Sequence, residues 1–167
     1  METKINSTLS VADKLIEITG WMLVALLWFF TIRIYFILPE IVPVHFDAAG
    51  NPNRYGSKSM LFFIDAIGTI IFIIMLVLSR AISSLTNLAD NFHDQEKIIF
   101  HKKETGKLFR ILAIIVLLIV FIIVFSVYGA MKGETALFGS WIPYVITGMF
   151  ILPTIYYLIR INSRKNT

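Results

Sequence analysis

Residues 38–58 contain several polar side chains whose types and spacing could support chemistry. His45 and Asp47 lie two positions apart, with Glu40, Arg54 and Lys58 in the same segment. A histidine beside a carboxylate can transfer protons, and either Asp47 or Glu40 could orient the imidazole ring of His45. We therefore predict that any reaction or recognition carried out by this protein takes place in this segment.

Metal chemistry is not expected there. A zinc site needs three or four ligands, and Glu40, His45 and Asp47 are the nearby candidates. The sequence contains no cysteine, which excludes thiolate ligands, thiol nucleophiles and disulfides. We predict neither a metal site nor a cofactor.

Structural roles would explain the same residues. His45 could be a hydrogen-bonding residue that holds the segment in place, and Lys58 could be an interfacial anchor whose stem lies on apolar surface. Ser57 and Ser59 could cap the helix that follows. The sequence leaves both the structural and the functional interpretations open.

The segment is expected to be folded. Pro39 and Pro43 end the preceding helix and favour an extended backbone. Residues 42–47 alternate apolar side chains with Pro43, His45 and Asp47, and residues 50–53 read Gly-Asn-Pro-Asn, which is typical of a turn. We predict an ordered loop with one apolar side.

The elements that position this loop are predicted to be membrane-spanning helices. The chain is 57% hydrophobic, and its mean hydropathy is +0.77. A helix crosses the bilayer with about 20 apolar residues, and four stretches qualify: 18–38, 60–78, 111–128 and 137–159. Pro143 and Pro153 predict that the fourth helix is kinked or begins late. The expected fold is an all-α membrane protein, with residues 1–167 forming a single four-span domain.

The basic residues predict the orientation of these spans. Eleven lie at the termini or between spans two and three: Lys4, Lys14, Arg80, Lys97, Lys102, Lys103, Lys107, Arg110, Arg160, Arg164 and Lys165. Four lie on or near the other side: Arg33, Arg54, Lys58 and Lys132. Because basic residues stay cytoplasmic, both termini are predicted to be cytoplasmic and loop 38–58 external. The high pI is thereby explained without a nucleic-acid partner.

Residues 79–110 form a long polar and amphipathic segment on the predicted cytoplasmic side. Apolar residues recur at helical spacing over 82–92, as in a helix that lies in the membrane interface. Residues 95–110 are expected to continue into span three. Their basic cluster would contact anionic lipid headgroups, which makes membrane lipids an expected partner.

Arg33 and Asp65 are the ionisable residues deepest in the predicted spans. Each lies five residues inside the outer boundary, so the two match in depth and oppose in sign. An unpaired charge in the bilayer is costly. We therefore predict an ion pair between spans one and two, beneath the outer loop.

The run Leu-Pro-x-x-x-Pro-x-His-Phe-x-x-x-Gly, followed after seven intervening residues by Lys, extends from Leu38 to Lys58. It resembles the signature of a bacterial membrane domain of unknown function, family 1648. That domain also occurs in the immunity protein of the sporulation-delaying toxin system. The resemblance implies a bacterial inner-membrane protein with these motif residues: Pro39, Pro43, His45, Phe46, Gly50 and Lys58.

We expect a protein of the toxin-immunity or ligand-recognition type, which acts at its outer face on a peptide toxin or another membrane protein. The alternative is a membrane-embedded enzyme that uses His45 and the neighbouring polar groups. A small transporter is the third interpretation, although spans three and four contain no charged residue to mark a transport path.

Overall fold

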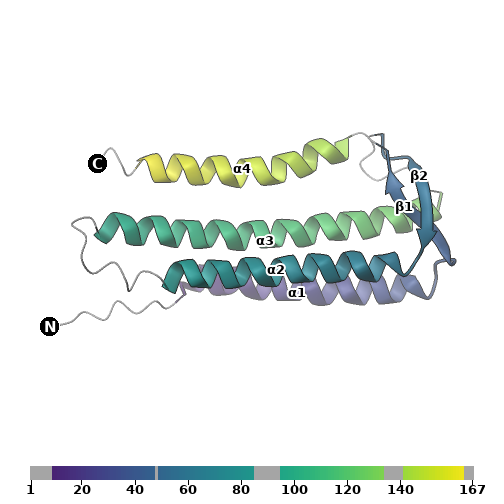
Figure 1. Cartoon of the computed structure of the whole chain (residues 1–167), viewed down its shortest axis with the longest axis horizontal. Coiled ribbons are helices and arrows are strands. Elements are labelled where there is room, and N and C mark those ends of the chain that lie inside the picture. The colour runs from purple at the N-terminus through teal and green to yellow at the C-terminus, as the bar shows by residue number, and fades with distance from the viewer. Residues whose placement is uncertain (1–8, 48, 85–94, 134–140, 164–167) are drawn as a thin grey trace.

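The structure is a computed structural model that describes residues 9–47, 49–84, 95–133 and 141–163. It consists of four helices and one β-hairpin (Figure 1): α1 (Val11–Tyr35), β1 (Ile41–Phe46), β2 (Pro52–Ser57), α2 (Met60–Ser84), α3 (Gln95–Met131) and α4 (Ile142–Ser163). All four helices are long and apolar enough to cross a membrane. The predicted four-span, mainly helical fold is confirmed, with the small hairpin added to it.

The four helices run side by side along the long axis of the molecule (Figure 1). The hairpin closes one end, which we call the hairpin end. Helix α1 begins and α4 finishes at the opposite end, which we call the far end. Within the described residues, the hairpin thus lies where α1 ends and α2 begins, opposite the start of α1 and the end of α4 (Figure 1).

The helices differ from the predicted spans at their boundaries. Helix α1 begins at Val11 because Ser10 and Asp13 form a capping box, in which each side chain accepts a hydrogen bond from the backbone N–H of the other at 3.1 Å. Helix α4 begins at Ile142, so the predicted late start is confirmed, and Pro143 occupies the first turn, where a missing N–H costs little.

The polar segment 79–110 divides between two helices. Residues 79–84 complete α2, and residues 95–110 form the first part of α3, as expected. Residues 85–94, where most of the predicted interfacial helix would lie, are outside the described residues. The prediction of an amphipathic segment between the second and third helices is therefore tested only at its two ends.

The buried core joins α1, α2, α3 and β1. It includes Leu27 and Ile34 from α1, Phe72 from α2, Val124 from α3 and Val42 from β1. Within the described ranges, α4 contributes no residue to this core and packs along α3. Its large apolar side chains stay exposed, as lipid-facing residues would be.

Small residues let the three core helices approach closely. A Cβ atom added to Gly20 of α1 would lie 2.4 Å from the Phe72 ring on α2, and one added to Gly68 of α2 would lie 2.6 Å from Val120 on α3. Side chains at these positions would force the helices apart. The platform that carries the hairpin is thus a tightly packed three-helix body, with α4 at its side.

Candidate functional site

The segment after α1 folds as an antiparallel hairpin. Its register runs from Ile41 opposite Ser57 to Phe46 opposite Pro52, with irregular pairing on either side of His45. In the turn, Asp47 accepts hydrogen bonds from the backbone N–H groups of Ala49 (2.9 Å) and Asn51 (2.8 Å). The outer loop is therefore ordered, as predicted, and most of its backbone forms two paired strands.

Asp47 serves the turn and does not contact His45. Hydrogen bonds from Asn51, foremost from its backbone N–H, hold the pKa of Asp47 below its ordinary value. The contribution of Asp47 to hairpin stability is therefore complete above the ordinary pKa of an aspartate. It is lost as the pH falls through the lowered pKa. Gly50, with φ of 83°, supplies the left-handed residue of the same turn.

His45 has an amide partner where a carboxylate was expected. Its Nδ1 lies 2.5 Å from Oδ1 of Asn53 on the opposite strand. Because an amide oxygen only accepts hydrogen bonds, this contact favours a proton on Nδ1, which in a neutral ring leaves Nε2 as an acceptor. The hypothesis that Asp47 or Glu40 orients this ring is wrong: Asp47 caps the turn, and Glu40 faces Ser57 and Lys58.

Lys58 fastens the base of the hairpin to the end of α1. Its Nζ donates to the carbonyl oxygen of Leu38 at 3.2 Å, lies 3.8 Å from Oε2 of Glu40, and sits 4.6 Å from the ring centre of Tyr35. Ser57 Oγ also donates to Glu40 Oε1 at 3.2 Å. The side chain of Lys58 is only 16% exposed, so this amine is engaged by the fold.

The hairpin has an apolar side and a polar side. Val42 and Pro43 are buried, and Val44 and Phe46 are half-buried against the core. From Val44 to Asp47 the side chains alternate between half-buried and exposed, as expected. The alternation fails at Pro43, which is buried like Val42 and lies next to the irregular strand pairing before His45.

Four side chains around the middle of the hairpin are exposed, and the three from β2 alternate between the two sides of the sheet because they are consecutive in the strand. We call this set the hairpin face: His45, Asn53, Arg54 and Tyr55. His45 pairs with Arg54 across the two strands. Among the described residues, the guanidinium of Arg54 has no ion-pair or hydrogen-bond partner. Of the predicted site residues, His45 and Arg54 lie together. Glu40, Asp47 and Lys58 instead form contacts that hold the turn and the base of the hairpin. Pro39 lies exposed before β1.

The predicted ion pair between Arg33 and Asp65 is not formed. Asp65 is fully buried, and neither of its carboxylate oxygens has a hydrogen-bond partner among the described residues. Arg33 is exposed. The two residues match in depth, but Thr31 and Ile34 form the buried side of α1, and Arg33 projects from a different side.

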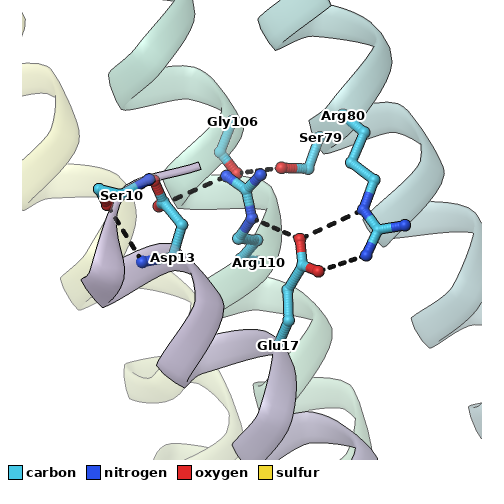
Figure 2. Close-up of polar contacts among 7 residues, drawn as sticks. All are labelled: Ser10, Asp13, Glu17, Ser79, Arg80, Gly106 and Arg110. Carbon is cyan, nitrogen blue, oxygen red and sulfur yellow. Dashed lines mark hydrogen bonds and ion pairs between the residues drawn. The ribbon is translucent and has the colours of Figure 1, made fainter. Parts of the chain in front are cut away.

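Charged residues do form ion pairs between the helices, but they do so at the far end (Figure 2). Arg110 of α3 is 1% exposed. It donates from Nε to Oε1 of Glu17 at 3.0 Å, and its Nη1 lies 3.5 Å from Oδ1 of Asp13. Arg80 of α2 binds Glu17 from the other side. We call these four residues the charge cluster: Asp13, Glu17, Arg80 and Arg110.

Further polar contacts surround the charge cluster. Ser79 Oγ donates to the carbonyl oxygen of Gly106 at 2.7 Å, which links α2 directly to α3 (Figure 2). On the other side of α3, Glu104 pairs with Arg160 of α4 at 2.9 Å. The far end is thus held by ionic and polar contacts between neighbouring helices.

The sequence carried one signal for the charge cluster that our prediction missed. Asp13 and Glu17 are four residues apart, so they share one side of α1, just outside the predicted first span. Arg80 and Arg110 were assigned to the cytoplasmic basic excess. To predict that they pair with Asp13 and Glu17, one must know which sides of the helices face each other, and a single sequence does not give this information.

Replacing the buried cation tests the charge cluster. Arg110→Met should destabilise the protein by about 3–5 kcal/mol, because it leaves the carboxylates of Asp13 and Glu17 buried with reduced compensation. The exposed Lys103→Met, a matched change on the same helix, should stay within about 0.5 kcal/mol. Denaturant unfolding in detergent micelles measures both, and equal stability of the two variants would contradict the assignment.

Comparison with known proteins finds a family whose model resembles the hairpin and the helix ends beside it. The family described as "Domain of unknown function (DUF1648)" matches residues 22–69, from within α1 through the hairpin into α2. The match contains the whole motif from Leu38 to Lys58, so the resemblance to that family is confirmed at this level. The narrower likeness to the immunity protein stays a prediction.

One relative is an "Uncharacterized protein" of the archaeon Archaeoglobus fulgidus. It is 38% identical to this chain over 69 residues, which cover 41% of this chain and 38% of that protein. The chain therefore spans well under half the length of this relative. No solved structure matches the chain.

Proposed function

We propose that the protein recognises an extended peptide segment of a toxin or of another membrane protein through its hairpin face. One observation carries this proposal: the hairpin is anchored on its apolar side and at its base, while His45, Arg54 and Tyr55 stay exposed. Side chains held by a packed scaffold but left exposed are typical of binding sites.

The hairpin also offers backbone groups to a peptide. In the described part of the chain its sheet has two strands, so the outer edge of β2 carries no further strand. A peptide can add to such an edge by main-chain hydrogen bonds, and side chains then select the sequence. Arg54 favours a carboxylate, and Tyr55, which is 57% exposed, favours an apolar or aromatic group.

An acid–base enzyme that uses His45 is less well supported. Asn53 favours the tautomer of the ring that leaves Nε2 as an acceptor, which a general base requires. However, among the described residues no carboxylate contacts His45, and no nucleophilic side chain is hydrogen-bonded to it. Binding therefore accounts for more of the hairpin face than catalysis does.

For such a protein to meet an external peptide, the hairpin end must face outward. The excess of basic residues at the far end supports this orientation in a bacterial inner membrane, with both termini cytoplasmic. The described helices agree with it in one respect, because α1 begins and α4 ends at the same end of the molecule (Figure 1).

Cysteine labelling tests the orientation, because the natural chain has no cysteine. Asn51→Cys in the turn should react with a membrane-impermeant maleimide in intact cells. Lys103→Cys near the start of α3 should react only after the membrane is permeabilised. The reverse labelling pattern would place the hairpin in the cytoplasm and exclude recognition of an external peptide.

Toxin protection tests the function itself. Cells that express the protein should survive a membrane-active peptide toxin to which the host is sensitive, identified by challenge with a panel of such peptides. His45→Ala and Arg54→Ala should each reduce survival at least tenfold, because they remove side chains from the hairpin face. Lys103→Ala should protect as the wild type does.

Membrane levels of all variants are matched by immunoblotting. The proposal fails if the wild-type protein protects against no peptide, or if His45→Ala and Arg54→Ala protect as well as Lys103→Ala.

A further inference from the structure

Asp65 is a buried acid that the hairpin does not use. It lies in the second turn of α2 and is 0% exposed, and both of its carboxyl oxygens lack a hydrogen-bond partner among the described residues. The hydroxyl of Thr31 on α1 lies next to it and is also buried without a formed hydrogen bond. Two polar groups without partners therefore face each other across the α1–α2 contact.

The other polar groups nearby are already engaged. Trp28 Nε1 donates to Thr69 Oγ1 at 3.1 Å, and Thr69 Oγ1 donates to the backbone carbonyl oxygen of Asp65 at 2.8 Å. These contacts use the donors of Trp28 and Thr69 one turn further along α2. Neither donor is left for the Asp65 carboxyl group.

No cation in the described structure balances a charge on Asp65. On α1, residues 18–32 contain no ionisable side chain, and Arg33 is exposed on another side. On α3, residues 111–127 contain none either, and Gly68 meets Val120, so Asp65 lies near the level of Val124. Lys58 precedes Asp65 by two helical turns and is held by Leu38, Glu40 and Tyr35.

An ionised carboxylate in this position would be buried in a membrane-spanning body with no counter-charge among the described residues, and with only the Thr31 hydroxyl beside it as a donor. Such burial is strongly unfavourable, and the neutral acid avoids it. The neutral acid also lets the two groups satisfy each other without a buried charge, because its O–H can donate to Thr31 Oγ1 after a small side-chain rotation.

We propose that Asp65 is a proton-binding site inside the bundle, occupied at neutral pH and shared with Thr31. Because the carboxyl group is fully buried, it exchanges its proton with solvent only when α1 and α2 separate beneath the hairpin. Loss of the proton leaves a carboxylate that the closed contact does not accommodate. Occupancy of the site is thus linked to the packing of α1 against α2, independently of what the hairpin face binds.

Infrared spectroscopy of the full-length protein tests this directly. The chain has 11 acidic residues, and a protonated carboxyl group gives a carbonyl stretch well separated from carboxylate bands. In a detergent without ester groups at pH 7, the wild-type spectrum should show this stretch, and Asp65→Asn should abolish it. Asp47→Asn is the matched control, and it should leave the band unchanged because Asp47 is exposed and hydrogen-bonded as a carboxylate.

The melting temperature of the purified, folded protein is a second measurement, and it does not depend on how much protein folds. Asp65→Asn copies the neutral acid in size, so its melting temperature at pH 7 should equal that of the wild type within a few degrees. Thr31→Val should keep the protonated band but shift its frequency, because it removes the hydrogen-bond acceptor.

Absence of the band from the folded wild-type protein at pH 7, or its persistence in Asp65→Asn, would overturn the proposal. A wild-type melting temperature that rises with sodium concentration, in a protein without the band, would assign the site to a metal cation and would equally overturn it.

Discussion

The fold depends on the neutralisation of Arg110 where three helices meet. A guanidinium that is 1% exposed must be compensated within the protein, and Asp13 and Glu17 of α1 provide the carboxylates. Glu17 in turn binds Arg80, so the same carboxylate links α1 to both α2 and α3 (Figure 2). These contacts specify which sides of the three helices face each other, whereas apolar packing in a membrane is far less selective.

The charge cluster aligns α1, α2 and α3 at the far end, and this alignment positions the helix ends that carry the hairpin. With α1 and α3 fixed, Gly20 and Gly68 allow the close contacts of α1 with α2 and of α2 with α3. The ends of α1 and α2 are then held near each other, and the hairpin closes the gap with its buried side on the core. Lys58 completes the arrangement by joining the start of α2 to the carbonyl oxygen of Leu38, just after α1. The hairpin face is thus presented by the packed body of α1, α2 and α3.

The sequence predicted the features that depend on length and local pattern. Long apolar stretches predicted four spans, and Pro39, Pro43 and the turn residues predicted an ordered loop between the first two. Features that depend on helix rotation were not predictable in the same way. Arg33 and Asp65 match in depth, but Arg33 lies two residues after the buried Thr31, about 200° around the helix. The partner of His45 likewise depends on strand register, which places Asn53 opposite it and turns Asp47 into the loop.

The central claim is that Lys58 and the packed bundle hold the hairpin as a rigid support for its exposed face. Hydrogen–deuterium exchange of the backbone amides of residues 41–57, measured on the protein in lipid nanodiscs, tests it most directly. A rigid hairpin should exchange slowly in the wild type, equally slowly in Tyr55→Ala, and at least tenfold faster in Lys58→Met. Fast exchange in the wild type, or equal protection in Lys58→Met, would contradict it.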